Sequence, residues 1–108
     1  MKMVSLILPL LDNENLPIPH AHDFVRRMFA KEFEGWTQYP VQGGWVNEGG
    51  SVMLDSSMKY EVAVPSGYAQ LSYSIDHFRQ IAMEAGHLGR QKAIFITIGN
   101  EAEIIQLV

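Results

Sequence analysis

Cysteine is absent from the 108 residues of the chain. Its absence excludes a disulfide framework, a cysteine-based zinc site, an iron–sulfur cluster and a thiol nucleophile. Charged residues are also few, at 19%, with 8 lysines and arginines against 12 aspartates and glutamates. A net charge of −4 argues against a general phosphate-backbone binder, which would gather Lys and Arg on one face. We therefore expect no nucleic-acid partner.

Long hydrophobic runs are missing as well. No apolar stretch approaches the ~18 residues of a membrane helix, so we expect no membrane partner. The N-terminal run from Met3 to Leu11 suggests a signal peptide at first sight. It is short, contains Ser5 and Pro9, and meets Asp12 with no small-residue cleavage site, so a first β-strand and a cytoplasmic protein are expected.

The apolar fraction of 47% is too high for a disordered chain. A length of 108 residues suits a single domain spanning 1–108, which needs no disulfide or structural metal to fold. Apolar residues recur with helical spacing in two segments and alternate with polar ones in others. The spacing predicts helices over 20–33 and 72–87, and strands over 3–10, 36–41, 52–64, 93–98 and 103–107.

Local signals refine the ends of these elements. Pro40 places the 36–41 strand at a sheet edge or next to a bulge, and Trp45-Val46 is expected to continue the strand past a bulge. Ser72 or Ser74 is expected to cap the second helix. The element order is β-α-β-β-α-β with a short terminal strand. It predicts an α+β ferredoxin-like βαββαβ fold, an antiparallel sheet with two helices on one face.

A family resemblance supports this fold. Gly44-Trp45 followed by the segment 55–64, Asp55-Ser56-Ser57-Met58-Lys59-Tyr60-Glu61-Val62-Ala63-Val64, resembles the central hairpin of small uncharacterised bacterial ferredoxin-like proteins. Gly89-Arg90-Gln91 before the 93–98 strand adds to the resemblance. These proteins often carry Glu at the position of Asp55. The resemblance implies a fold and no reaction, because this fold serves many unrelated functions.

The sheet face opposite the helices has an unusual composition. If the helices cover Leu6, Tyr60 and Ile94, alternation along the strands places a mixed polar and apolar set on the other face. That set is Ser5, Ile7, Lys59, Glu61, Ala63, Phe95 and Thr97, joined by Asp55 and Ser57 if their strand is unbroken. A second subunit could cover this face in a homodimer, the face could hold a ligand cleft with Glu61 at its floor, or it could be plain surface.

Aromatic and glycine residues gather around the 36–50 hairpin. Trp36 and Trp45 are candidates for a ligand or subunit contact, and they could also stack on RNA bases. The aromatic signature of an RNA-recognition sheet is missing from the strands, however. The glycines lie between strands and not before a helix, so turns explain them better than a phosphate site does.

The segment His20-Ala21-His22-Asp23 contains possible metal ligands. On a helix, His20 and His22 point about 200° apart and cannot face one metal ion. We expect both histidines to be exposed or capping residues, so we expect neither a metal nor another cofactor.

No catalytic motif stands out. None of the serines lies in a Gly-x-Ser-x-Gly elbow, and no His–Asp partner is placed by the sequence. Asp55 and Glu61 are six residues apart on one strand, ~20 Å by rise alone, which is too far for an acid–base pair. The sequence favours a non-catalytic binding or interaction module that acts as a homodimer through the open sheet face. The alternative is a small cofactor-free enzyme with a cleft near Glu61.

Overall fold

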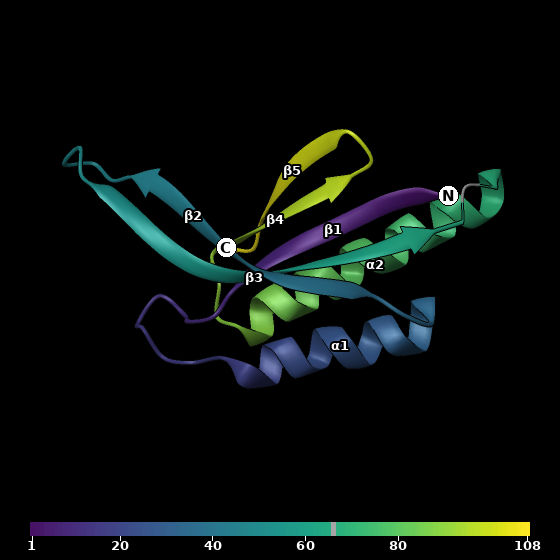
Figure 1. Ribbon diagram of the computed structural model, residues 1–108, viewed down its shortest axis with the longest axis horizontal. Coiled ribbons are helices and arrows are strands. Elements are labelled where there is room, and N and C mark those ends of the chain that lie inside the picture. Colours follow the sequence, from purple (N-terminus) through teal and green to yellow (C-terminus); the bar gives the residue numbers. More distant parts are fainter. Residues whose placement is uncertain (66) are drawn as a thin grey trace.

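The computed structural model describes residues 1–65 and 67–108, and for 68–71 the backbone alone. The elements are β1 (Lys2–Pro9), α1 (Pro19–Phe33), β2 (Thr37–Val46), β3 (Val52–Val64), α2 (Tyr68–Leu88), β4 (Ala93–Ile98) and β5 (Glu101–Gln106). The strands form one antiparallel sheet in the order β2-β3-β1-β4-β5, and both helices lie on the same face (Figure 1). The predicted α+β ferredoxin-like βαββαβ fold is therefore confirmed, with its extra C-terminal strand. No helix among the described residues is long and apolar enough to cross a membrane.

The core lies between the helices and one face of the sheet, as the strand alternation predicts. Leu6, Tyr60 and Ile96 are fully buried on this face, which we call the helix-side face. The apolar stripes of the two helices meet them, and the ring of Phe29 in α1 stacks on that of Phe78 in α2 with centroids 6.1 Å apart. Such aromatic packing contributes about 0.5–1.5 kcal/mol beyond the burial of area.

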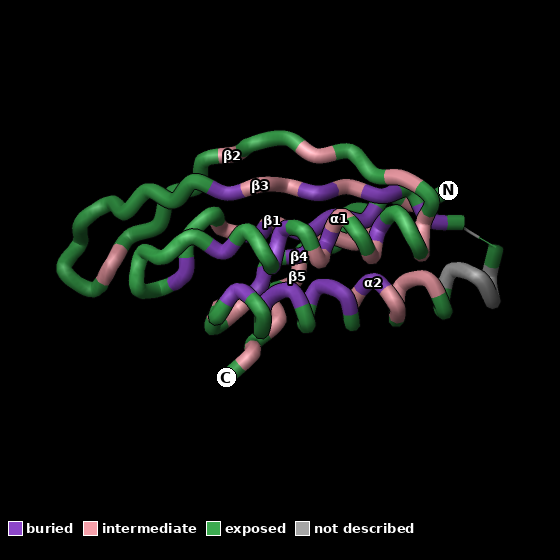
Figure 2. Tube along the Cα trace, turned by 90° about the horizontal axis from the view of Figure 1, so that it is seen from below, coloured by how far each residue is buried: buried purple, intermediate pink, exposed green. Residues whose placement is uncertain are grey.

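A hairpin arm extends beyond the sheet at one end. β1 reaches only to the pair Pro9↔Ser57, whereas β2 and β3 stay paired to Val46↔Val52. We define the hairpin arm as residues 42–56. It projects from the body in Figure 1, and almost all of it is exposed in Figure 2.

Two local predictions are corrected in β2 and α2. The β2–β3 register is continuous through Pro40 and Trp45, so the expected bulge is absent. β2 is an edge strand, as predicted, and an edge tolerates the missing N–H of proline without a bulge. α2 begins at Tyr68 after an extended Gly67, so neither Ser72 nor Ser74 caps it. The helix starts earlier because strong helix formers precede those serines in the sequence.

Candidate functional site

The face opposite the helices, the open face, carries the residues that the alternation predicts. Ile7 pairs with Lys59 on one side and Phe95 on the other, and Ser5 pairs with Glu61 and Thr97. β3 is unbroken, so Asp55 shares this face. Two cross-strand rows result, Tyr39–Lys59–Ile7–Phe95–Ile104 and Thr37–Glu61–Ser5–Thr97–Ala102.

A cavity on this face lies where the hairpin arm meets the sheet. We call it the open-face pocket; its volume is about 700 Å³. Its lining residues are Ile7, Pro9, Gly43, Gly44, Trp45, Asp55, Ser57, Ala93, Ile94, Phe95 and Ile104. All five strands contribute to it, so the pocket depends on the whole sheet and not on one loop. Small-molecule sites typically enclose about 300–1,000 Å³.

Among the described residues that line this pocket, Asp55 is the single charged one. The indole Nε1–H of Trp45 donates to Asp55 Oδ2 at 3.0 Å, so the carboxylate is oriented beside an aromatic ring. Phe95 and Ile104 form apolar walls. A carboxylate among aromatic and aliphatic walls attracts a ligand that combines a flat apolar group with a positive charge.

Glu61 and Trp36, two of the sequence candidates, lie in a second, smaller cleft of about 290 Å³. Glu61 accepts a hydrogen bond from the Tyr39 hydroxyl. The Lys59 ammonium stands 5.8 Å from the centre of the Tyr39 ring. The larger pocket therefore contains Asp55 and not Glu61, because the hairpin arm supplies a wall only at the Asp55 end. The two carboxylates line separate clefts, which agrees with the expectation that they do not form an acid–base pair.

Ser5 and Thr97 bond to each other in the middle of the open face. Their hydroxyl oxygens are 2.5 Å apart, and Ser5 is buried although it lies on this face. Neither residue lines the open-face pocket. Their hydroxyls satisfy one another between two strands, so the pair stabilises the sheet beside the pocket.

His22 is buried, which corrects the expectation of an exposed or capping residue. Its Nε2 lies 2.8 Å from the Pro9 carbonyl and its Nδ1 2.6 Å from the Tyr60 hydroxyl, so both ring nitrogens are occupied. The helix turns His22 inward because its neighbours Ala21 and Val25 belong to the buried stripe. No cluster of three metal-ligating side chains occurs in residues 1–65 and 67–108.

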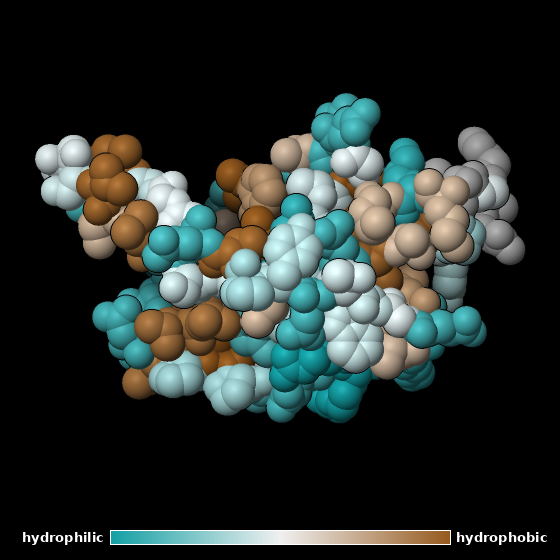
Figure 3. All heavy atoms as spheres, in the orientation of Figure 1, coloured by the Kyte–Doolittle hydropathy of each residue, from teal (hydrophilic) through white to brown (hydrophobic). Residues whose placement is uncertain are grey.

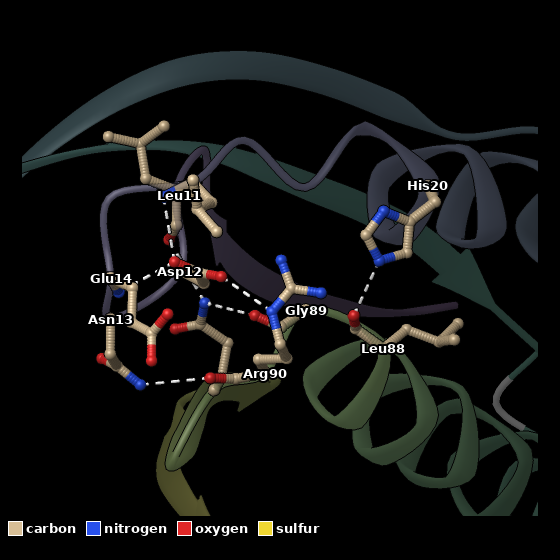
Figure 4. A network of polar contacts seen from close by, with 10 residues as sticks. Leu11, Asp12, Asn13, Glu14, His20, Leu88, Gly89 and Arg90 are labelled. Carbon is tan, nitrogen blue, oxygen red and sulfur yellow. Dashed lines mark hydrogen bonds and ion pairs between the residues drawn. The ribbon is translucent and has the colours of Figure 1, made fainter.

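A polar clasp that the sequence did not reveal joins the β1–α1 loop to the end of α2 (Figure 4). Asp12 is 7% exposed, and its Oδ1 accepts the backbone N–H groups of Glu14 and Leu16 at 2.8 and 2.9 Å. Its Oδ2 accepts Nε of Arg90 at 2.7 Å. The hydrogen bond from Leu16 is the main cause that lowers the pKa of Asp12 below its ordinary value.

Further contacts reinforce the clasp in Figure 4. Asn13 Nδ2 donates to the Arg90 carbonyl at 3.1 Å, and Gln91 Nε2 donates to the Leu11 carbonyl at 3.3 Å. His20 Nε2 lies 2.8 Å from the Leu88 carbonyl, so this exposed histidine is held at the same end. Pro9 and Ala93, which line the open-face pocket, stand three residues from Asp12 and Arg90 in sequence. The clasp therefore fixes the two chain segments that enter one end of the pocket.

Comparison with known proteins identifies the fold class. No protein-family model matches the chain, and no curated protein matches it in sequence. A phage SAM (S-adenosylmethionine) lyase, solved in complex with S-methyl-5′-thioadenosine, is similar with a TM-score of 0.74 and 9% identity. The match covers 97% of this chain and 88% of that chain.

Two proteins of another kind share the same architecture. The PII-like protein CutA from Nostoc sp. PCC 7120, in apo form, has a TM-score of 0.61 and 16% identity over 94% of this chain and 81% of that chain. The periplasmic divalent cation tolerance protein CutA from Archaeoglobus fulgidus has a TM-score of 0.56 and 12% identity over 90% and 79%. The chain therefore has the ferredoxin-like fold of PII-like proteins, and identities this low show the fold alone.

Sequence reasoning found part of the pocket. Strand alternation located Ile7, Phe95 and Asp55, and the hairpin aromatics included Trp45. It missed Pro9, Ala93 and the wall from β5, of which Ile104 is part. The register between β4 and β5 decides which β5 residues face the pocket, and the Gly99-Asn100 turn was the signal for that register.

Proposed function

We propose that the chain binds S-adenosylmethionine in the open-face pocket. The observation that carries this proposal is the setting of Asp55, a lone carboxylate among aromatic and apolar walls. The fold adds support, because the similar phage lyase was solved with a thioadenosine, a molecule with the same nucleoside and sulfur. Its TM-score of 0.74 exceeds the 0.61 of the CutA protein from Nostoc, which favours the lyase as the guide to the ligand.

The chemistry of the ligand suits this pocket. S-adenosylmethionine has a flat adenine ring, and Trp45 and Phe95 offer ring surfaces against which it can pack. It also has a positively charged sulfonium and an ammonium group, and the Asp55 carboxylate attracts either one. The lining glycines, Gly43 and Gly44, allow the ligand to approach the backbone of the arm closely.

Self-association through the open face is part of the same proposal. The hairpin arm exposes large apolar side chains on both of its faces, including Trp45 at 53% and Leu54 at 65% exposure. Figure 3 shows hydrophobic side chains gathered on the projecting arm. A two-stranded ribbon is marginally stable in water by itself. A second copy placed over the open face buries one side of the arm and encloses the ligand.

The second candidate function is cleavage of the bound S-adenosylmethionine. The bond between the sulfonium sulfur and Cγ of the methionine moiety breaks, and the sulfur keeps the electron pair. The carboxylate of the same moiety bonds to Cγ, which gives S-methyl-5′-thioadenosine and a five-membered lactone. This reaction needs no cofactor, and Asp55 would hold the substrate's ammonium group. The specific observation in its favour is the fold likeness to the lyase.

Calorimetric titration with S-adenosylmethionine and with S-methyl-5′-thioadenosine tests binding, and chromatography of the incubated mixture tests cleavage. The proposal expects saturable binding that Asp55→Asn weakens and Glu61→Gln leaves unchanged. Appearance of S-methyl-5′-thioadenosine with the wild type but not with Asp55→Asn supports the cleavage. Binding without product supports a binding function without cleavage. If neither compound binds at millimolar concentration, the proposal is overturned.

A further inference from the structure

A chain of hydrogen bonds runs from helix α1 through the core to the wall of the open-face pocket. Arg26 Nη1 donates to the Tyr60 hydroxyl oxygen at 3.3 Å. The Tyr60 hydroxyl is 2.6 Å from His22 Nδ1, and His22 Nε2 is 2.8 Å from the Pro9 carbonyl. Pro9 is the last residue of β1 and lines the pocket. The chain is buried at its centre, because Tyr60 is fully buried and His22 is 6% exposed.

The direction of these bonds is fixed by the groups at the two ends. The Pro9 carbonyl can only accept, so His22 carries its proton on Nε2. The Arg26 guanidinium can only donate, so the Tyr60 oxygen accepts from it and gives its own hydrogen to His22 Nδ1. The arrangement therefore requires a neutral imidazole.

A second proton on His22 breaks this arrangement. With Nδ1 protonated, the Tyr60 oxygen faces two donors, His22 and Arg26, and its own hydrogen loses its acceptor. The new positive charge also lies near Arg26. Where the imidazole does take up this proton, burying the charge is costly. We expect the ring to move towards water, and only this movement takes the Nε2–H donor away from the Pro9 carbonyl.

The charged and titratable neighbours support a neutral His22 at neutral pH. From its own helix, Arg26 disfavours the second proton and Asp23, which forms an ion pair with Arg26, favours it. The neighbouring group on β3 is Tyr60, whose pKa is raised by burial, and the Pro9 carbonyl of β1 accepts from Nε2 and favours the second proton. Burial is the largest cause and lowers the pKa of His22 below 6.5.

We propose that His22 is a proton-operated switch that lowers the ligand affinity of the open-face pocket when its imidazole becomes charged. The inference rests on the proposed function for the identity of the ligand. The mechanism itself rests on the contacts of His22, Tyr60 and Pro9. Acidification below the ordinary range of histidine removes one of the bonds that hold the Pro9 end of β1, and this wall of the pocket is then held less firmly.

His22→Gln is the decisive variant, because the amide of glutamine also offers one donor and one acceptor but does not titrate. His20→Gln is the matched control, since His20 is an exposed histidine on the same helix. Calorimetry with S-adenosylmethionine at pH 7.5 and pH 5.0 is the first measurement. The switch predicts at least a fivefold loss of affinity on acidification in wild type and His20→Gln. In His22→Gln the loss should stay below twofold.

A second measurement needs no ligand. Methyl NMR of Ile7, which lines the pocket, is followed from pH 8 to pH 5 together with the ring signals of His22. The switch predicts that Ile7 shifts with the same midpoint as His22. It is overturned if Ile7 stays constant while His22 titrates, or if His22→Gln loses affinity as the wild type does. If S-adenosylmethionine does not bind at pH 7.5, the proposed ligand is refuted but the switch is not. The NMR measurement then tests whether protonation of His22 changes the pocket.

Discussion

The indole N–H of Trp45 on β2 donates to the carboxylate of Asp55 on β3, 3.0 Å away, across the base of the hairpin arm. The two residues do not face each other directly, because Trp45 pairs with Met53 and Asp55 pairs with Gly43. The bond is therefore diagonal, and it holds the negative charge and the ring side by side in the pocket lining. A ligand meets a preformed pair, which lowers the ordering cost of binding.

Asp55→Asn tests the charge of this pair. The amide keeps the size of the side chain but loses the attraction for a cation, and charged hydrogen bonds are worth about 1.5–3 kcal/mol. The expected result is a roughly 10- to 100-fold weaker affinity for S-adenosylmethionine by calorimetry. The thermal midpoint should stay nearly constant, because Asp55 is exposed. Glu61→Gln is the control; an equal loss there would remove the special role of Asp55.

Trp45→Phe tests the contribution of the indole N–H to ligand binding apart from that of the aromatic ring. Phenylalanine still offers a flat surface to the ligand, but Asp55 loses the donor that orients it. Calorimetry should show a loss of affinity smaller than that of Trp45→Ala, which removes both features. Equal affinities for Trp45→Phe, Trp45→Ala and wild type would show that the hairpin arm does not take part in binding.

Tyr60→Phe tests the buried hydrogen-bond chain through stability. Removing the hydroxyl leaves His22 Nδ1 without a donor in the core, which costs about 1–3 kcal/mol of unfolding free energy. Urea unfolding at pH 7.5 measures the change. Tyr39→Phe is the control, because the Tyr39 hydroxyl bonds to Glu61 at an exposed position and should change stability by less than about 0.5 kcal/mol. Similar effects of the two substitutions would contradict the importance of the buried chain.

The alternation of apolar residues accounts for most of what the sequence predicted. Alternation places Tyr60 and Ile94 in the core and Glu61 and Thr97 on the open face, because residues two apart on a strand share a face. The start of α2 was less predictable, whereas that of α1 was predicted to within one residue. A helix start depends on local capping, and Gly67 gives no capping side chain that could mark it.

The pH dependence of stability follows from His22 and Asp12. The folded state lowers the pKa of His22, so the unfolded chain binds its proton more readily, and stability is full above 6.5 and falls as the pH drops below it. The lowered pKa of Asp12 adds a second loss as the pH drops below 3.8. Urea unfolding from pH 8 to pH 3 should show both steps. His22→Gln should lack only the first, and an unchanged first step in that variant would refute its assignment.

Met53→Asp tests self-association through the open face of the hairpin arm, which Met53 shares with Trp45 and Asp55. Met53 is 40% exposed in the single chain, so the charge should not disturb folding. Buried against a second copy, an unpaired carboxylate is costly, and the assembly should dissociate. Light scattering after size-exclusion chromatography should show an oligomer for wild type and a monomer for the variant. A monomeric wild type at micromolar concentration would contradict the assembly.

The candidate site was only partly predictable, because its parts meet through long-range contacts. Asp55 could be placed on the open face by alternation, but the sequence does not show that the hairpin arm reaches past Pro9 and forms a wall. The buried role of His22 depends on Tyr60, which is 38 residues away in sequence. The ion pair of Asp12 with Arg90 spans 78 residues. No local pattern in the sequence predicts contacts between residues so far apart.

The central claim is that S-adenosylmethionine occupies the open-face pocket. A ¹H–¹⁵N NMR titration that follows the indole N–H of Trp45 tests it most directly, because this proton bonds to the Asp55 carboxylate in the pocket. We expect the indole signal to shift and saturate as ligand is added, together with the signals of Ile7 and Phe95. In Asp55→Asn the indole shift should not saturate over the same range of ligand concentration. An unmoved indole signal at millimolar ligand, or shifts confined to the groove between the helices at Phe24 and Leu88, would contradict it.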